Sequence, residues 1–169
     1  MSAARLTRDD IFEILEEVKD PEVPVLSVVE LGIVRDVELS ATGVTVRITP
    51  TYSGCPAMHV IEEEIRATLD AHQVPLVRLE TVFAPAWTTD WLSADAKKKL
   101  EEYGIAPPGP AAHDSLVSLT RAPVRVESPR CPYCHSPDTA IRSEFGSTAC
   151  KSIAYCNACE QPFELFKPL

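Results

Sequence analysis

Residues 49–59 read TPTYSGCPAMH, a stretch in which a strand ends, a tight loop follows and a helix begins. Proline is favoured at the first position of a helix, because its ring fixes φ near the helical value and its missing N–H would have no partner there. Pro56 therefore predicts a helix start that leaves Cys55 at the N-cap. Unpaired N–H groups and the positive end of the helix dipole favour a thiolate at that position. Cys55 is thus a candidate reactive or metal-binding sulfur.

A cysteine can also cap a helix without taking part in chemistry, and this structural alternative stays open for Cys55. The neighbouring side chains favour a functional loop, since Thr51, Tyr52 and His59 supply polar groups that a turn does not need. If Cys55 is a nucleophile, its base is either His59, about one helical turn further on, or a residue distant in the sequence. A histidine at such a position more often lies on the helix surface. An enzyme that acts through the Cys55 thiol is therefore the alternative hypothesis.

Hydrophobic periodicity on both sides of this stretch predicts an α/β (α+β) domain with the order α-β-β-α-β-α. We expect helices near residues 8–18, 56–69 and 94–103, and strands near 33–39, 44–49 and 76–83. The first helix begins with Thr7 as its N-cap and acidic residues in its first turn. The last two strands should be parallel, because a helical crossover returns the chain in the same direction and gives a mixed three-stranded sheet. The Cys55 loop then lies at the carboxyl end of the second strand, where α/β sheets often bind ligands.

Two C-x2-C pairs near the other end of the chain predict a metal-binding zinc ribbon, a small β module. The ligands are Cys131, Cys134, Cys156 and Cys159, whose four thiolates can converge tetrahedrally on one zinc ion per chain. Iron held as in rubredoxin uses the same ligands and remains an alternative. A module of this size has too small a core to fold alone, so the metal must contribute about 10–16 kcal/mol. Cys150 is left over and should be free.

The chain should divide into two domains joined by a linker rich in proline and alanine. We expect an N-terminal domain at residues 1–104, a linker at 105–129 and the zinc ribbon at 130–169. The linker begins where Pro107, Pro108, Gly109 and Pro110 interrupt every hydrophobic pattern.

Charge and composition limit the partners that the chain can have. The net charge is −9, and the whole acidic excess lies in residues 1–112. Such a surface disfavours a nucleic-acid partner, because that affinity comes from Lys and Arg side chains that neutralise phosphates. No apolar run approaches the length of a membrane span, and the first residues lead into a charged helix rather than a signal-peptide core. We therefore expect a cytoplasmic protein without a membrane or nucleic-acid partner.

Several short motifs resemble known families. The segments DPEVP at 20–24, ELGIV at 30–34 and TYSGCP at 51–56 resemble the SufT-like iron-sulfur assembly domain, over residues 5 to about 85. The segments PAWTTDW at 85–91, GIAPP at 104–108 and GSTACK at 146–151, together with the ribbon, resemble the PaaD family of the bacterial phenylacetyl-CoA epoxidase system. This second resemblance covers nearly the whole chain.

The resemblance implies an accessory subunit rather than the oxygenase that forms the ring 1,2-epoxide in aerobic phenylacetate catabolism. Its expected role is to assist assembly or maintenance of an iron-sulfur cluster or iron centre in the complex, with the di-iron oxygenase or the iron-sulfur reductase as partner. The family's cysteine corresponds to Cys55, and its acidic segment corresponds to Asp20 and Glu22, which could contact iron or a cluster transiently. The sequence lacks the paired Glu-x-x-His motifs of a di-iron site and the G-x-G-x-x-G nucleotide fingerprint, which also favours a non-catalytic subunit.

Overall fold

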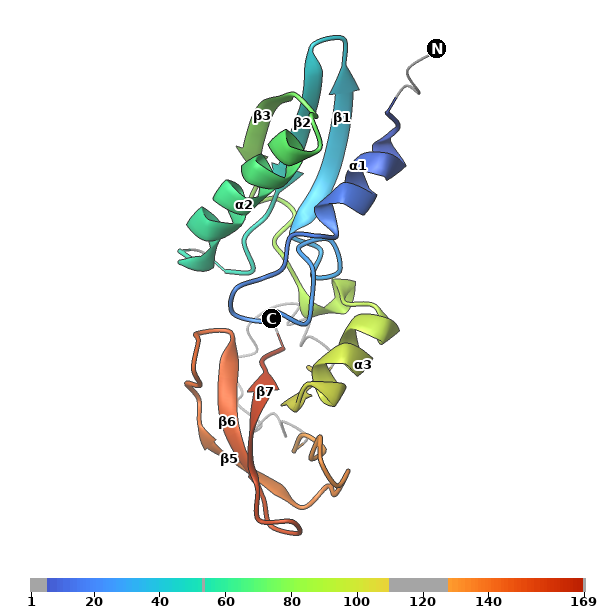
Figure 1. Cartoon of the computed structure of the whole chain (residues 1–169). Helices are drawn as coiled ribbons and strands as arrows, with labels where there is room; N and C mark the ends of the chain where they lie inside the picture. Colours follow the sequence, from blue (N-terminus) through green and yellow to red (C-terminus); the bar gives the residue numbers. More distant parts are fainter. Residues whose placement is uncertain (1–5, 53, 110–127, 169) are drawn as a thin grey trace. The chain divides into compact units, whose positions relative to one another are not determined.

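The computed structural model describes residues 6–52, 54–109 and 128–168, in two compact units (Figure 1). The first unit comprises Met1–Trp87 and Trp91–Ala96, and the second comprises Thr88–Asp90 and Lys97–Leu169. Within the described ranges, no helix is long and apolar enough to cross a lipid bilayer.

The first unit contains a mixed three-stranded sheet, as predicted. Along the chain its elements are α1 (Arg8–Leu15), β1 (Val34–Ser40), β2 (Gly43–Ile48), α2 (Ala57–Ala71) and β3 (Leu76–Thr81). The strand order is β1-β2-β3, with β1 antiparallel and β3 parallel to β2. A short 3-10 helix (Thr89–Trp91) and α3 (Ala94–Glu102) follow. This confirms the α-β-β-α-β-α order, and the parallel pair places the Cys55 loop at the carboxyl end of β2.

Local sequence signals determine where the first helix begins. The Thr7 hydroxyl accepts a hydrogen bond from the N–H of Asp10 at 3.2 Å, and the Asp10 carboxylate accepts one from the N–H of Thr7 at 2.7 Å. This reciprocal capping box confirms the predicted N-cap. The helix ends at Leu15, earlier than the hydrophobic pattern predicted.

The helices bury one face of the sheet. α1 contacts both β1 and α2, and α2 contacts β3. The fully buried side chains on these elements include Ile11, Leu15, Val46, Ile48, Ile61, Ile65 and Leu69. Burial of one such side chain contributes about 1.5–3 kcal/mol, so this layer supplies most of the free energy that holds the first unit together.

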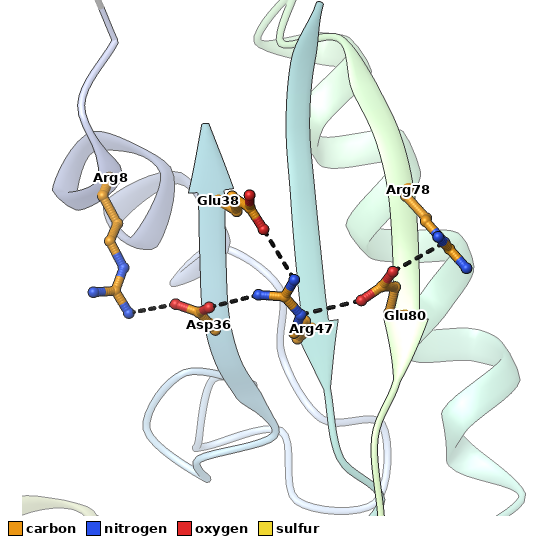
Figure 2. A network of polar contacts seen from close by, with 6 residues as sticks. All are labelled: Arg8, Asp36, Glu38, Arg47, Arg78 and Glu80. Carbon is orange, nitrogen blue, oxygen red and sulfur yellow. Dashed lines mark hydrogen bonds and ion pairs between the residues drawn. The ribbon is translucent and has the colours of Figure 1, made fainter. Parts of the chain in front are cut away.

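The opposite face of the sheet carries a chain of ion pairs (Figure 2). Its members are Arg8, Asp36, Glu38, Arg47, Arg78 and Glu80. Arg47 lies at the centre, with guanidinium nitrogens 2.8, 2.9 and 3.1 Å from carboxylate oxygens of Asp36, Glu38 and Glu80. These acids raise the pKa of Arg47 further above its ordinary value. Arg47 therefore neutralises three carboxylates that would otherwise repel one another across the strands.

Replacing Arg47 with Met should lower the urea midpoint of unfolding, because three ion pairs are lost together and their carboxylates are left to repel one another. The loss should shrink as salt is added, since mobile ions then screen those carboxylates. Urea unfolding at low and high salt measures both effects. Arg78→Met is the matched control: that side chain is 71% exposed and has one acidic partner here. We expect the loss for Arg47→Met to be roughly threefold larger, and equal losses would contradict a central role for Arg47.

The loop after β3 is attached to the first unit by tryptophan. Trp87 is buried, and its indole N–H donates a 2.8 Å hydrogen bond to the carbonyl oxygen of Leu31. The guanidinium of Arg35 lies 3.6 Å from the ring centroid of Trp91, whose side chain also lies close to Gly32. Trp87 therefore contacts the segment that precedes β1, and Trp91 contacts that segment and the first part of β1.

The second unit contains a four-stranded sheet in the order β4-β7-β6-β5. Its strands are β4 (Ile105–Ala106), β5 (Thr139–Ser143), β6 (Lys151–Cys156) and β7 (Pro162–Phe166). β4 is parallel to β7, and the other pairs are antiparallel. The core combines apolar side chains with metal-ligand cysteines: Ala106, Cys131, Ala154, Cys156, Phe163 and Leu165.

The predicted linker begins within this sheet. Ile105 and Ala106 were assigned to the linker because the following prolines interrupt all periodicity, yet both are buried and pair with β7. A two-residue strand is too short to leave a periodic signal, so only its distant partner reveals it. Residues 110–127 of the predicted linker lie outside the described residues, and the remaining domain bounds stay a prediction.

Candidate functional site

Cys55 lies in the loop between β2 and α2, one residue before the helix cap. The helix begins at Ala57 with Pro56 as its N-cap, so the prediction that Cys55 is the N-cap is wrong by one residue. Pro56 does have the helical dihedral angles that the prediction used, with φ −67° and ψ −24°, but the helix is first formed at Ala57, and Pro56 makes no side-chain capping hydrogen bond. The carbonyl oxygen of Cys55 accepts a 3.3 Å hydrogen bond from the N–H of Met58, which still ties this residue to the first helical turn.

The structure raises the pKa of the Cys55 thiol above its ordinary value, contrary to the thiolate expected from the sequence. Burial of the half-buried thiol is the largest cause, and the negative charge of Glu22 acts in the same direction. Hydrogen bonds from the N–H of Ala57 and the side chains of Thr51 and Tyr52 oppose the shift. The helix terminus thus acts in the predicted direction, but desolvation outweighs it. Cys55 is therefore a protonated thiol at neutral pH.

The pH dependence of alkylation should show this shift directly. Only the thiolate reacts with iodoacetamide, so the rate at Cys55 should keep rising as the pH passes 9.0, the ordinary pKa of a cysteine thiol. At neutral pH the rate should fall below that of a free cysteine peptide. Peptide mass analysis of metal-loaded protein gives the rate at this position alone. If the alkylation rate at Cys55 reached half its maximum below about pH 8, the result would support the thiolate inferred from the sequence instead.

The two predicted acidic residues differ in their surroundings. Asp20 is 6% exposed, and its Oδ1 accepts hydrogen bonds from the N–H groups of Glu22 at 2.7 Å and Val23 at 2.8 Å. Glu22 is half-buried, and its charge reaches the thiol of Cys55. The fold therefore brings Glu22 to the cysteine from the loop after α1, whereas the Asp20 carboxylate contacts its own loop.

The histidine proposed as a base lies elsewhere on the helix surface. The side chain of His59 is 79% exposed, and its Nδ1 lies 3.5 Å from Oε1 of Glu63. The residues that donate to the thiol are instead Thr51 and Tyr52, for which the sequence suggested polarity but no role. Their place just before the cysteine in a strand-to-helix loop is the signal that could have identified them.

The second site is the group of four cysteines in the second unit. The sulfur atoms of Cys131, Cys134, Cys156 and Cys159 all lie within 4.8 Å of one another. Two sulfur pairs are closer, at 3.6 Å for Cys131 and Cys159 and 3.5 Å for Cys134 and Cys156. Zinc–sulfur bonds of about 2.3 Å in a tetrahedron place the sulfurs about 3.8 Å apart, so this group fits one such ion. The structure thus brings together all four predicted ligands.

The turn after β6 prepares this group for metal. The N–H groups of Cys159 and Ala158 donate to the sulfur of Cys156 and lower the pKa of that thiol to about 7. Backbone N–H donors of this kind stabilise the thiolate form that a metal ion requires. Two of the ligands, Cys131 and Cys156, are fully buried in the core of the second unit.

Cys150 lies outside this group. It is buried, and its sulfur lies 3.1 Å from the hydroxyl oxygen of Thr148. Replacing it with Ser should therefore leave the metal content of the purified protein unchanged. Cys156→Ser is the matched control and should lose the ion. Metal analysis of both variants measures this, and a loss of the ion from Cys150→Ser would show that the ligand assignment is wrong.

Comparison with known families places both sites in matched segments. Residues 8–82 match a family described as iron-sulfur cluster assembly protein, and residues 117–167 match the PaaD zinc beta ribbon domain. The ribbon match starts at residue 117, within the predicted linker, and the domain bounds stay a prediction.

Curated relatives match either nearly the whole chain or slightly more than half of it. A protein of Escherichia coli (strain K12), provisionally named as the D subunit of 1,2-phenylacetyl-CoA epoxidase, is 43% identical over 158 residues, which are 94% of this chain and 91% of that protein. An Fe-S protein maturation auxiliary factor of Porphyromonas gingivalis is 38% identical over 96 residues, which are 56% of this chain and 90% of that protein.

Two solved structures match slightly more than half of the chain. A domain of unknown function, DUF59, from Bacillus anthracis is 28% identical with a TM-score of 0.51, and the match covers 55% of this chain and 90% of that one. A conserved hypothetical protein of Thermotoga maritima is 29% identical with a TM-score of 0.50, and the match covers 59% of this chain and 98% of that one.

Proposed function

Because this chain belongs to the PaaD family of phenylacetyl-CoA epoxidase subunits, we propose that it is a non-catalytic accessory subunit that assists assembly or maintenance of an iron-sulfur cluster or iron centre in that epoxidase system. The relatives named as Fe-S maturation factors support the assisting role, and so does the iron-sulfur cluster assembly family, whose match at residues 8–82 includes Cys55. The observation that carries the proposal is the half-buried thiol of Cys55 at the carboxyl end of β2, whose pKa is affected by the negative charge of Glu22. The cargo is iron or a cluster, and Cys55 is its transient ligand.

The environment of Cys55 suits a ligand that binds and releases. At rest, burial and the charge of Glu22 keep the thiol protonated by raising its pKa. A cation at this position offsets both effects. Its positive charge compensates for the desolvation of the thiolate, and it attracts the Glu22 carboxylate. When the cation leaves, the proton returns. A sulfur that is costly to ionise without a cation therefore holds its cargo weakly enough to pass it on.

Thiol catalysis at Cys55 finds less support. A nucleophilic cysteine needs a lowered pKa or a base within hydrogen-bond reach. Here the pKa is raised, and the side chain of His59 pairs with Glu63. We therefore retain the accessory role alone.

The proposal assigns one structural zinc ion to the ribbon, since a closed set of four thiolates is typical of such sites. Rubredoxin-like iron would fit the same sulfurs, and metal analysis of the purified protein distinguishes the two. The proposed location is the cytoplasm, where cysteine thiols stay reduced; the six cysteines here form no disulfide with one another. The partners are other subunits of the epoxidase, with the di-iron oxygenase and the iron-sulfur reductase as candidates.

Anaerobic transfer tests this function. The zinc-loaded chain is charged with ferrous iron, alone or with sulfide, and mixed with metal-free oxygenase or metal-free reductase. We expect iron to appear in one partner after separation, faster than from the same iron in buffer. Equal rates with and without the chain would contradict the proposal.

A further inference from the structure

We propose that a groove beside α1 is a docking site for a basic amphipathic helix of a partner subunit, in which lysine or arginine side chains flank an apolar one. The inference rests on the proposed function for the identity of that subunit, since the candidates are the oxygenase and the reductase of the epoxidase system. The residues that form the groove belong to the first unit and lie outside the Cys55 loop.

The groove has a volume of about 410 Å³ and follows one face of α1. Asp10, Glu13 and Glu17 are spaced three and four residues apart, which places them on one side of a helix. Leu6 is 42% exposed, and Ile14 is half-buried. The groove therefore combines accessible apolar surface with a row of carboxylates. Its lining residues are Leu6, Asp10, Glu13, Ile14, Glu17 and His72.

No lysine or arginine of the described residues neutralises the carboxylates of this groove. Asp10 caps α1, and Oε1 of Glu17 lies 3.1 Å from Nε2 of His72, which is the C-cap of α2. Glu13 has no ion-pair or side-chain hydrogen-bond partner in this part of the chain. Arg8, the basic residue of α1, pairs at 2.7 Å with a carboxylate of β1 instead. The groove is therefore an acidic surface with an unpaired carboxylate at its centre.

The helix itself disfavours acids at these positions. α1 has no basic residue in its last turn, and Glu13 and Glu17 lie toward the end where the helix dipole repels a negative charge. Glu13 is also four residues from both Asp9 and Glu17, and like charges at that spacing destabilise a helix. If α1 served packing alone, a lysine at position 13 would make it more stable. A cationic partner explains the acids, because its binding removes their mutual repulsion.

A helix that carries several cations fits this groove better than a metal ion does. Among the residues that the structure describes, only the four ribbon cysteines bring enough ligand atoms close together to hold one ion. The acids of the groove are spread over about 10 Å of helix instead. Lysine or arginine side chains on successive turns of a partner helix match this spacing, and an apolar side chain between them can contact Leu6 and Ile14.

Binding of the zinc-loaded chain to purified oxygenase and, separately, to purified reductase tests the site. Biolayer interferometry gives the affinity and the association rate for each subunit. We expect one of them to bind the parent chain, with an affinity that falls as salt is added. Glu13→Lys should weaken that binding about tenfold at low salt, mostly through slower association. Glu64→Lys makes the same charge change at an exposed position of α2, and this matched control should alter the affinity little.

The apolar part of the groove is tested in the same way. Leu6→Ser should weaken binding about fivefold, because the exposed part of this side chain leaves water in the complex. Leu39→Ser is the matched control, since Leu39 is also 42% exposed but lies on β1 and outside the groove. We expect this second variant to bind like the parent.

Urea unfolding of Glu13→Lys separates docking from a structural role. Lysine removes the repulsion along α1 and suits the negative end of the helix dipole, so the unfolding midpoint should rise while the affinity for the partner falls. A fall in both quantities would mean that Glu13 supports folding rather than docking, and would overturn the inference.

Three further results would overturn it. Neither subunit binds the parent chain, Glu13→Lys binds as weakly or as tightly as Glu64→Lys, or the chain alone sediments as a dimer that Glu13→Lys abolishes, which would make a second copy the occupant. Failure of the proposed function looks different. The differences in binding then hold, but iron reaches the bound partner no faster than from the same iron in buffer.

Discussion

Cells that express the whole epoxidase gene set with Cys55→Ala in place of the parent chain should lose phenylacetyl-CoA epoxidation by roughly tenfold or more, the range seen when groups that support a metal are removed. Alanine removes the sulfur from the loop between β2 and α2. The remaining donors, Thr51 and Tyr52, offer hydroxyl oxygens, which are poor replacements for a thiolate as a soft ligand for iron. The iron content of the partner subunits should fall together with turnover.

Stability should change little in the same variant. Cys55 is half-buried and precedes the helix, so its truncation should lower the free energy of unfolding by about 1 kcal/mol. Ribbon metal content and urea unfolding of the purified variant provide this control. Cys150→Ala is the matched variant elsewhere in the chain and should leave turnover unchanged. Equal turnover and equal partner iron for Cys55→Ala and the parent would exclude Cys55 from the mechanism.

Removing the ribbon metal should unfold the sheet of β4 to β7 while the first unit stays folded. Metal binding to small zinc modules contributes about 10–16 kcal/mol, more than the net stability of most domains. Without the ion, Cys131 and Cys156 would leave buried sulfurs at the centre of a core with few apolar side chains. The first unit has its own buried layer of helices on a sheet and does not depend on this metal.

Limited proteolysis and amide hydrogen exchange of chelated protein measure this difference. We expect exchange protection to vanish along β6 and β7, to persist along β2 and α2, and to return when zinc is added. The Cys156→Ser variant should behave like the chelated protein without any chelator. Full protection of β6 in metal-free protein would show that the apolar core suffices.

Features that depend on nearby residues could be predicted from the sequence alone. Apolar spacing identified the helices and strands of the first unit, and the pairing of Thr7 with Asp10 marked the start of α1. The four metal ligands could be predicted because each pair of cysteines is closely spaced in the sequence, and two such pairs can bind one ion together. These features do not depend on distant segments, since each is determined by covalent geometry or by contacts within a few residues.

Features whose partners are distant along the chain required the folded structure. The thiol of Cys55 is protonated because folding buries it and brings Glu22 near, and both effects raise its pKa against the local helix terminus that the sequence shows. The Trp87 indole binds a carbonyl oxygen 56 residues away, and Ile105 becomes a strand only because β7 lies beside it. Desolvation, long-range charge and strand pairing depend on which segments meet in space, and periodicity along one chain does not contain that information.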